Sequence, residues 1–224
     1  MKKIIIGIYG ASGYGKEVMP LVQEQIKSSN DECELIFIDD DPATSMLLNH
    51  AVVNFEEFMA IEGDKHVAVI AIGESSIRKI LTEKCLVNDV KLLDIKASNV
   101  IILEDVQIGD GFILNPFVTL TSDIRIGKSF QANIYSYVAH DCVIGDYVTF
   151  APGVKCNGNI EIGDHAYIGT GAILKQGKPG FPLVIGEGAI VGAGSMVTKS
   201  VPAGMTVFGN PAIELTKENL ARRR

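Results

Sequence analysis

Hydrophobic residues follow two different patterns along this chain, and the pattern changes near residue 95. In the first part, short apolar runs alternate with segments whose apolar residues recur three and four positions apart, as on one face of a helix. The expected strands and helices lie at residues 3–9, 16–26, 35–38, 67–72 and 77–86. Strand and helix alternate in this order, which predicts a small Rossmann-like parallel sheet with crossover helices over residues 1–95.

From Val106 onward, small apolar residues recur at every sixth position. The series consists of Val106, Phe112, Val118, Ile124, Phe130, Cys142, Val148, Val154, Ile160, Ala166 and Ala172, with Ser136 as its one polar member. The pair Ile-Gly begins at residues 108, 126, 144 and 162, a spacing of 18, and then at 185, after 23 residues. Because eighteen is three times six, each coil has three short sides, and the five extra residues fall within the segment from Gly177 to Pro182.

A six-residue period fits neither a helix nor a simple alternating strand, and it is the sequence signature of a parallel β-helix. A chance alignment in a glycine-rich β-sandwich would not keep this six-residue phase over so long a stretch of sequence. We therefore expect a left-handed prism over residues 96–213, whose apolar ladder fills the core coil by coil, and a C-terminal tail at 214–224. The left hand is an exception to the rule for crossovers and depends on the hexapeptide motif alone.

Charge and cysteine content exclude several classes of protein. The net charge is −7, whereas binding of duplex nucleic acid needs clustered Lys and Arg, so we expect no nucleic-acid partner. The basic run Arg222–Arg224 is expected to be a solvated tail. No stretch reaches the ~18 apolar residues of a membrane span, and the apolar run after Lys2 and Lys3 is too short for a signal peptide. Four cysteines without a CxxC motif favour a reducing compartment, so we expect a cytoplasmic protein.

Several segments carry a resemblance to a known family. They are residues 9–15 (YGASGYG), 37–41 (FIDDD), 71–73 (AIG), 77–79 (IRK), 139–145 (AHDCVIG) and 207–212 (VFGNPA). On these motifs the chain resembles, over nearly its whole length, the NeuD-like and PglD-like group of left-handed β-helix acyltransferases, which contains sialic-acid O-acetyltransferases and UDP-4-amino-sugar N-acetyltransferases. Many acyltransferases share the hexapeptide repeat, but its combination with this N-terminal domain is far more specific. The resemblance implies a homotrimer with active sites between adjacent prisms and acetyl-CoA as the acetyl donor.

His140 and Asp141 are the residues best suited to catalysis. N-acetylation of a sugar amine needs a base that works near neutral pH to remove the ammonium proton, and imidazole meets that need. A neighbouring carboxylate can fix the imidazole tautomer and increase its basicity. An isolated His-Asp pair in a turn is more often solvated surface, but the resemblance assigns His140 as general base and Asp141 as its modulator. Cys142 occupies an inward repeat position and is expected to fill the core rather than act as a nucleophile.

Two further sets of residues are expected to bind substrates. The glycine loop at residues 10–15 follows a strand and opens a helix, so its backbone amides suit a diphosphate. By resemblance, a UDP-linked amino sugar binds this domain through Ser12, Gly13, Tyr14, Asp39, Asp40 and Gly73. By the same resemblance, acetyl-CoA lies in a groove between subunits lined by Thr149, Gly158, Thr170 and Ala193. For each residue, a role limited to the turns of the fold is the plainer alternative. The backbone amide of Gly158 is a candidate donor to the carbonyl oxygen as it becomes an oxyanion.

These expectations describe an acetyl-CoA-dependent N-acetyltransferase that acts on the 4-amino group of a UDP-linked amino-deoxy sugar in bacterial glycan biosynthesis. Sialic-acid-type O-acetylation would use the same chemistry on a hydroxyl, and a non-catalytic trimer that binds a sugar nucleotide is a third candidate. A nicotinamide-dependent dehydrogenase is a fourth, although a segment of about 95 residues is short for its sheet. We expect no metal, because the prism has two histidines, His140 and His165, and a three-histidine zinc site would need an unusual arrangement.

Overall fold

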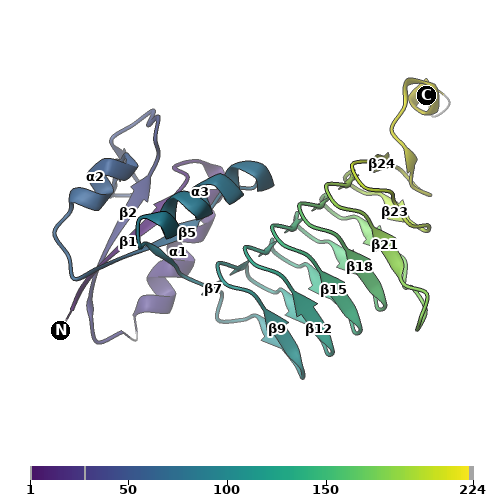
Figure 1. Cartoon of the computed structure of the whole chain (residues 1–224), viewed down its shortest axis with the longest axis horizontal. Helices are drawn as coiled ribbons and strands as arrows, with labels where there is room; N and C mark the ends of the chain where they lie inside the picture. The colour runs from purple at the N-terminus through teal and green to yellow at the C-terminus, as the bar shows by residue number, and fades with distance from the viewer. Residues whose placement is uncertain (1, 28, 222–224) are drawn as a thin grey trace. The chain divides into compact units, whose positions relative to one another are not determined.

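The computed structural model describes residues 2–27 and 29–221, and the chain forms two compact units, Met1–Ala97 and Ser98–Arg224 (Figure 1). Each unit has its own hydrophobic core. The basic run Arg222–Arg224 lies outside the described residues.

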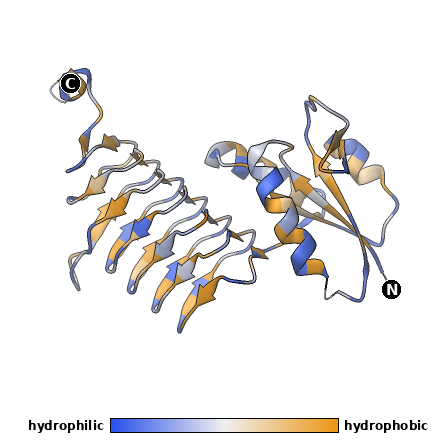
Figure 2. Ribbon diagram, turned by 180° about the vertical axis from the view of Figure 1, so that it is seen from behind, coloured by the Kyte–Doolittle hydropathy of each residue, from blue (hydrophilic) through white to orange (hydrophobic). Residues whose placement is uncertain are grey.

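The first unit is built on a sheet with strand order β3-β4-β2-β1-β5-β6. Its strands are β1 (Lys3–Tyr9), β2 (Glu32–Ile38), β3 (Met46–Leu47), β4 (His50–Val53), β5 (Lys65–Ile70) and β6 (Lys91–Leu92), and β7 (Ile95–Lys96) follows them. The helices are α1 (Gly13–Ile26), α2 (Phe55–Ala60) and α3 (Ser75–Val87). Neighbouring strands run parallel except in the β3–β4 hairpin. Figure 2 shows the central strands mainly in the colour of hydrophobic residues, because strands that are covered on both faces bury every side chain.

The hairpin β3–β4 and helix α2 are absent from the sequence-based prediction. With two to six residues each, these elements are too short for their hydrophobic periodicity to be recognised. Helix α2 begins instead with a capping box. Asn54 Oδ1 accepts a hydrogen bond from the N–H of Glu57 at 2.8 Å, and Glu57 Oε2 accepts one from the N–H of Asn54 at 3.0 Å.

The second unit is the expected left-handed β-helix, a prism whose three sides are parallel sheets of short strands (Figure 1). The first side contains β10 (Ile113–Leu114), β13 (Gln131–Ala132), β16 (Thr149–Phe150), β19 (Tyr167–Ile168), β22 (Ile190–Val191), β24 (Thr206–Phe208) and the antiparallel β25 (Ile213–Glu214). The second contains β8 (Ile101–Ile102), β11 (Thr119–Leu120), β14 (Tyr137–Val138), β17 (Lys155–Cys156), β20 (Ile173–Leu174) and β23 (Met196–Val197). The third contains β9 (Val106–Ile108), β12 (Ile124–Ile126), β15 (Cys142–Ile144), β18 (Ile160–Ile162) and β21 (Leu183–Ile185).

The six-residue ladder fills the core of this prism. Residues one coil apart are paired, so that Ile124 lies beside Cys142 and Cys142 beside Ile160. All three side chains are buried, which confirms the inward position predicted for Cys142. The polar member, Ser136, is also buried, and its hydroxyl donates to Ala151 O at 3.0 Å and accepts from Val154 N at 3.1 Å. Ser136 therefore fits the core because both of its hydrogen-bonding functions are satisfied.

In most coils, each corner of the prism contains a residue with positive φ. The corner between the second and third sides, called here the Asx corner, has Asp105, Asp123, Asp141 and Asn159, with φ of 50°, 54°, 56° and 57°. The corner between the first and second sides, called here the glycine corner, has Phe117, Tyr135, Gly153, Gly171 and Gly194. The third has Gly111, Ser129, Tyr147, His165, Gly188 and Gly204. Gly, Asn and Asp adopt this backbone conformation most readily, which explains their recurrence.

Aromatic residues at these corners stack on the residue one coil away. The rings of Phe117 and Tyr135 are parallel at 4.8 Å, and those of Tyr147 and His165 at 5.1 Å. Such stacking contributes about 0.5–1.5 kcal/mol, comparable with the roughly 1–2 kcal/mol that a left-handed conformation costs. His165 is thus a corner residue of the prism.

The five extra residues of the long coil form a turn that projects after β20. Lys178 N donates to Phe181 O at 3.0 Å, and Phe181 N donates to Lys178 O at 2.8 Å. Pro179 and Gly180, whose φ is +75°, occupy the centre of the turn, as they do in type II turns. Toward the C-terminus, the segment expected as a tail contains Glu214 of β25 and helix α4 (Lys217–Ala221).

Candidate active site

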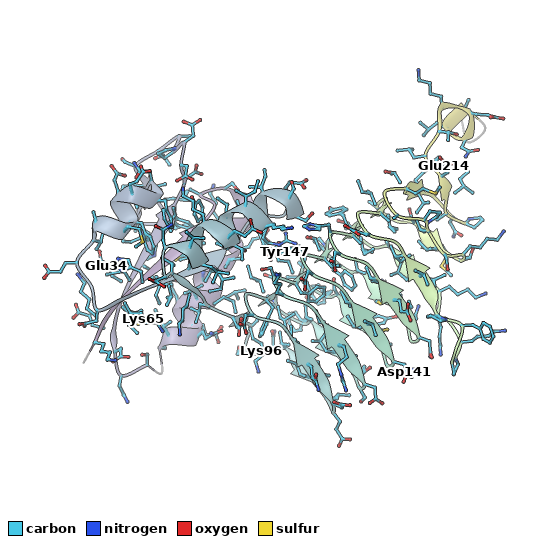
Figure 3. All side chains as sticks on the ribbon, viewed as in Figure 1. Glu34, Lys65, Lys96, Asp141, Tyr147 and Glu214 are labelled. Carbon is cyan, nitrogen blue, oxygen red and sulfur yellow. The ribbon has the colours of Figure 1, made fainter. Side chains whose placement is uncertain are left out.

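His140 and Asp141 lie together at the Asx corner, between β14 and β15 (Figure 3, in which Asp141 is labelled). His140 Nδ1 lies 2.5 Å from Asp141 Oδ2, and the two side chains are 49% and 53% exposed. Because a carboxylate can only accept, Nδ1 carries the proton in this hydrogen bond, which leaves Nε2 of the neutral ring with its lone pair directed away from Asp141. The pair can therefore act as a general base toward a ligand at the corner.

Gly158 lies under the imidazole ring, one coil further along the prism. A Cβ atom on Gly158 would lie 2.5 Å from His140 Cε1 and 2.6 Å from Nε2, so the close approach of the ring requires glycine. Within the described residues, the N–H of Gly158 donates to no acceptor. The carbonyl oxygen of Gly158 accepts from Gly177 N at 2.9 Å. A donor amide without a partner thus lies beside the ring of His140.

The other expected CoA residues do not gather around His140 within one chain. Thr149 is buried in β16 on the first side of the prism. Thr170 and Ala193 are exposed at the glycine corner, one coil apart, and Thr170 O accepts from Gly194 N at 2.8 Å. Gly158 alone of the four shares a corner with His140. The structure therefore divides the predicted CoA residues between two corners and one side.

A basic hollow of about 250 Å³ lies beside the projecting turn. Lys175, Lys178 and Lys199 line it together with the exposed Phe181. Gly177, which is hydrogen-bonded to Gly158 as described above, is also among the residues that line it. Since strands of neighbouring coils are about 4.8 Å apart, the hollow starts on the order of 10 Å along the prism from His140. The extra residues of this turn are evident in the sequence, but the three lysines gather only once the two coils are stacked, and so they are absent from the sequence-based prediction.

In the first unit, the glycine loop has the geometry expected of an anion site. Gly10 has a φ of +112°, and a Cβ on Gly15 would lie 1.9 Å from Gly10 O, so both positions require glycine. Ser12 is the N-cap of α1, makes no side-chain capping hydrogen bond and is exposed, as is Gly13, while Tyr14 is half-buried. The exposed N-terminus of α1 is thus of the kind that can receive a phosphate.

Two strand ends flank this loop and are held by hydrogen bonds. Asp39 Oδ2 accepts from the N–H of Ala11 at 3.3 Å, which ties the end of β2 to the glycine loop. After β5, the buried Arg78 donates from Nη1 to Ile72 O at 2.7 Å and to Gly73 O at 3.0 Å. The structure therefore brings Asp39 to the loop and fixes the backbone of Gly73 through Arg78, a residue to which the sequence analysis assigns no role.

Asp40 takes part in an internal network. Its carboxylate accepts from Tyr9 Oη, from Lys84 Nζ at 2.9 Å and from the N–H of Phe55 at 3.2 Å. Burial opposes ionisation of Asp40, but the hydrogen bonds from Tyr9, Lys84 and Phe55 prevail and lower its pKa. Burial and the bond to Asp40 raise the pKa of Tyr9, which remains a neutral donor. Both carboxylate oxygens of Asp40 accept hydrogen bonds from within the domain, which tie the end of β2 to Tyr9, Phe55 and Lys84.

Comparison with known proteins links both units to one family. The model of the PglD N-terminal domain matches residues 5–85, and that of the bacterial transferase hexapeptide (six repeats) matches residues 123–158. Over 214 residues the chain is 47% identical to a GDP-perosamine N-acetyltransferase of Escherichia coli O157:H7, covering 95% of this chain and 97% of the relative. The chain belongs to the NeuD/PglD-like family of acetyltransferases.

Solved structures extend this likeness to three dimensions. The acetyltransferase superposes on WeeI from Acinetobacter baumannii AYE with a TM-score of 0.91 at 56% identity, covering 95% of this chain and 100% of WeeI. The acetyltransferase domain of PglB from Neisseria gonorrhoeae FA1090, solved in complex with acetyl coenzyme A, gives 0.83 at 26% identity, covering 94% and 98%. The predictions of the family, the two-part fold and an acetyl-CoA-dependent acetyltransferase are confirmed.

No helix among the described residues has the length and apolar character needed to cross a membrane. Within residues 2–27 and 29–221, no group of three or more His, Cys, Asp or Glu side chains is placed to hold a metal ion.

Proposed function

We propose that this acetyltransferase transfers the acetyl group of acetyl-CoA to the 4-amino group of a nucleotide-linked amino-deoxy sugar in bacterial glycan biosynthesis. The observation that carries the proposal is the arrangement at the Asx corner. There, an imidazole oriented by Asp141 lies against the unpaired backbone amide of Gly158. A base and an oxyanion donor in contact with each other are the two groups that amide formation from a thioester needs.

The reaction proceeds by direct attack. His140 Nε2 takes a proton from the sugar amine as its nitrogen attacks the thioester carbonyl carbon and forms the new C–N bond. The carbonyl oxygen becomes negative and accepts a hydrogen bond from the N–H of Gly158. When the intermediate collapses, the C–S bond breaks, and the proton held by His140 passes to the CoA sulfur. Asp141 stabilises the imidazolium that exists between the two proton transfers, and no covalent enzyme intermediate is required.

Acetyl-CoA is proposed to extend from His140 toward the basic hollow. The hydrogen bond between Gly177 and Gly158 connects the two places on neighbouring coils. Lys175, Lys178 and Lys199 gather there in a chain whose net charge is −7. Three ammonium groups around one hollow suit the phosphate groups of CoA, which are the most charged part of the molecule.

The nucleotide sugar is proposed to bind the first unit through Ser12, Gly13, Tyr14, Asp39 and Gly73, with Asp40 supporting that site from behind. The exposed helix N-terminus supports a diphosphate in the loop. The E. coli relative is named for GDP-perosamine. That likeness favours a GDP-linked sugar over the UDP-linked sugar expected from the motifs.

A homotrimer with sites between adjacent prisms completes the proposal. Thr170 and Ala193 lie at the glycine corner, whereas His140 and Gly158 lie at the Asx corner. A groove between two prisms would bring the Asx corner of one chain to the glycine corner of the next, so that all four residues could line a single molecule of acetyl-CoA.

Release of free CoA thiol from acetyl-CoA tests this function. The acceptors are GDP-perosamine, a UDP-linked 4-amino-dideoxy sugar and sialic acid. We expect release with GDP-perosamine, a loss of about 10²–10⁴-fold in His140→Ala, and an unchanged rate in the control His165→Ala, which removes the other prism histidine. Release with the UDP sugar alone would mean that the substrate carries uridine rather than guanosine. Release with sialic acid alone would make the enzyme an O-acetyltransferase. Nucleotide-sugar binding without release from any acceptor would indicate a non-catalytic protein, and a near-full rate in His140→Ala would refute the assigned base.

A further inference from the structure

The turn that contains the peptide group between Asn157 and Gly158 is held by one contact to that peptide group and by two hydrogen bonds of the Asn157 side chain. The carbonyl oxygen of the peptide group, Asn157 O, faces the buried thiol of Cys142, whose sulfur lies 3.3 Å away. In a trans peptide the N–H points opposite to the C=O. Since the carbonyl is directed at a core thiol, the N–H of Gly158 points away from that thiol. The Cα of the same residue lies against the ring of His140, where a Cβ would clash.

The side chain of Asn157 fixes the same turn to the neighbouring coils. Its Nδ2 donates to Leu174 O at 2.6 Å, in the coil that follows. Its Oδ1 accepts from the hydroxyl of Tyr137 at 2.9 Å, in the coil that precedes. Both ends of the amide are occupied, so Asn157 cannot rotate unless one of these bonds is broken.

Among Cys142, Asn157 and Tyr137, the hydrogen bond of Tyr137 is the one that a substitution can remove without changing the core. Its ring belongs to β14 and is half-buried on the second side of the prism. Burial raises the pKa of Tyr137, so the hydroxyl keeps the proton that it donates to Asn157. Phenylalanine at this position would keep the ring and lose only the hydrogen bond.

We propose that Tyr137 is a positioning residue for acetyl transfer: through Asn157, its hydroxyl keeps the N–H of Gly158 aimed at the carbonyl oxygen of the thioester. This inference rests on the proposed function, in which that amide stabilises the oxyanion. An oxyanion donor must be in place before charge develops, and loss of a whole donor costs about 10²–10³-fold in kcat. If the donor is present but no longer held in place, we expect a smaller decrease in kcat than this.

The test compares Tyr137→Phe with Tyr135→Phe. Tyr135 lies two residues earlier, is exposed, and its ring stacks on Phe117, which phenylalanine preserves. We expect Tyr137→Phe to lower kcat by about tenfold, with unchanged KM for acetyl-CoA and for the sugar nucleotide and an unchanged form of the pH profile of kcat/KM. Tyr135→Phe should match wild type. A rise in either KM at constant kcat would mean that Tyr137 touches a substrate directly, and a wild-type kcat would mean that its hydroxyl has no part in the reaction. Both results overturn the proposal.

A double-variant cycle establishes the route through Asn157. If Tyr137 acts by holding Asn157, then Tyr137→Phe should lower kcat by no more than about twofold when Asn157 is already alanine. Full additivity of the two losses overturns the proposal. Asn157→Ser serves the same purpose if Asn157→Ala does not fold. Failure of the function itself would look different, because wild type would then release no CoA or His140→Ala would keep its rate.

Discussion

At the scale of single residues, Asp141 satisfies two requirements at once. Its backbone has a φ of +56°, and the same corner of neighbouring coils uses Asp123 and Asn159 in the same conformation. The backbone alone therefore explains why an Asp or Asn stands there. The hydrogen bond to His140 is the additional feature, and it distinguishes Asp141 from the other residues of the Asx corner.

Asp141→Asn separates these two requirements. Asparagine suits the corner, as Asn159 demonstrates, but its amide does not stabilise an imidazolium as a carboxylate does. We expect normal folding and a kcat lower by about 10–10²-fold, less than for a buried triad aspartate because Asp141 is half exposed. The matched control is Asp123→Asn, one coil away, which should keep the wild-type rate. Equal rates for wild type and Asp141→Asn would show that the corner alone accounts for this residue.

Asp40 yields a prediction about acid stability. Its pKa is lowered in the folded protein by the bonds from Tyr9, Lys84 and Phe55. A depressed pKa contributes stability at pH values above the unfolded pKa of roughly 3.9 and loses that contribution as pH falls through the folded value. Thermal melts of wild type and Asp40→Asn should therefore differ at pH 7 and converge as pH falls below about 4. A difference in Tm that stayed constant from pH 7 to pH 3 would contradict this account.

At the scale of elements, the hexapeptide pattern predicts more than the α/β pattern does. Inward residues such as Val118 and Ile160 recur with one period because every coil repeats one geometry, so the strands of the prism follow from the sequence. Helix α2 begins at a local capping box around Asn54, which the hydrophobic periodicity does not predict. The residues of the candidate site also differ in how well the sequence predicts them. His140 stands in a motif that is recognisable in the sequence, whereas Tyr137 and Asn157 meet only because β14 and β17 are stacked.

The projecting turn at residues 177–182 gives a prediction about acetyl-CoA. Changing Lys175, Lys178 and Lys199 to Gln together removes three positive charges from one hollow. Surface charge pairs contribute up to about 1 kcal/mol each, so we expect KM for acetyl-CoA to rise roughly tenfold at low salt and less at high salt, with kcat unchanged. The wild-type preference for acetyl-CoA over its 3′-dephospho analogue should also diminish.

The control for this prediction changes the same number of charges elsewhere. Lys27, Lys65 and Lys91 are exposed lysines of the first unit, and none lines the hollow. Their combined change to Gln should leave KM for acetyl-CoA as in wild type. An equal rise in both triple variants would indicate an effect of net charge rather than a phosphate site.

At the scale of the whole molecule, the proposed reaction needs more than one chain. The Asx corner supplies a base and an oxyanion donor, while Thr170 and Ala193 stand at another corner. A cyclic trimer is built from head-to-tail interfaces between unlike surfaces of identical chains, so a ring of three prisms would repeat the same pairing of corners three times. The nucleotide held by the first unit of one chain would then serve His140 of its neighbour.

Complementation between two inactive variants tests this arrangement. His140→Ala lacks the base, and Gly13→Phe places a ring in the glycine loop at a position where a Cβ meets no atom within 4 Å, so the domain should still fold. In trimers assembled from equal amounts of both chains, a shared site needs His140 from one variant and an intact loop from the other. Each condition is met by half of the chains, so about one quarter of the sites meet both. We therefore expect about one quarter of the wild-type rate, although each parent variant is inactive. Mixed trimers, verified by two affinity tags, that remained inactive would mean that each site is built within one chain, and a monomer in sedimentation would exclude the shared site altogether.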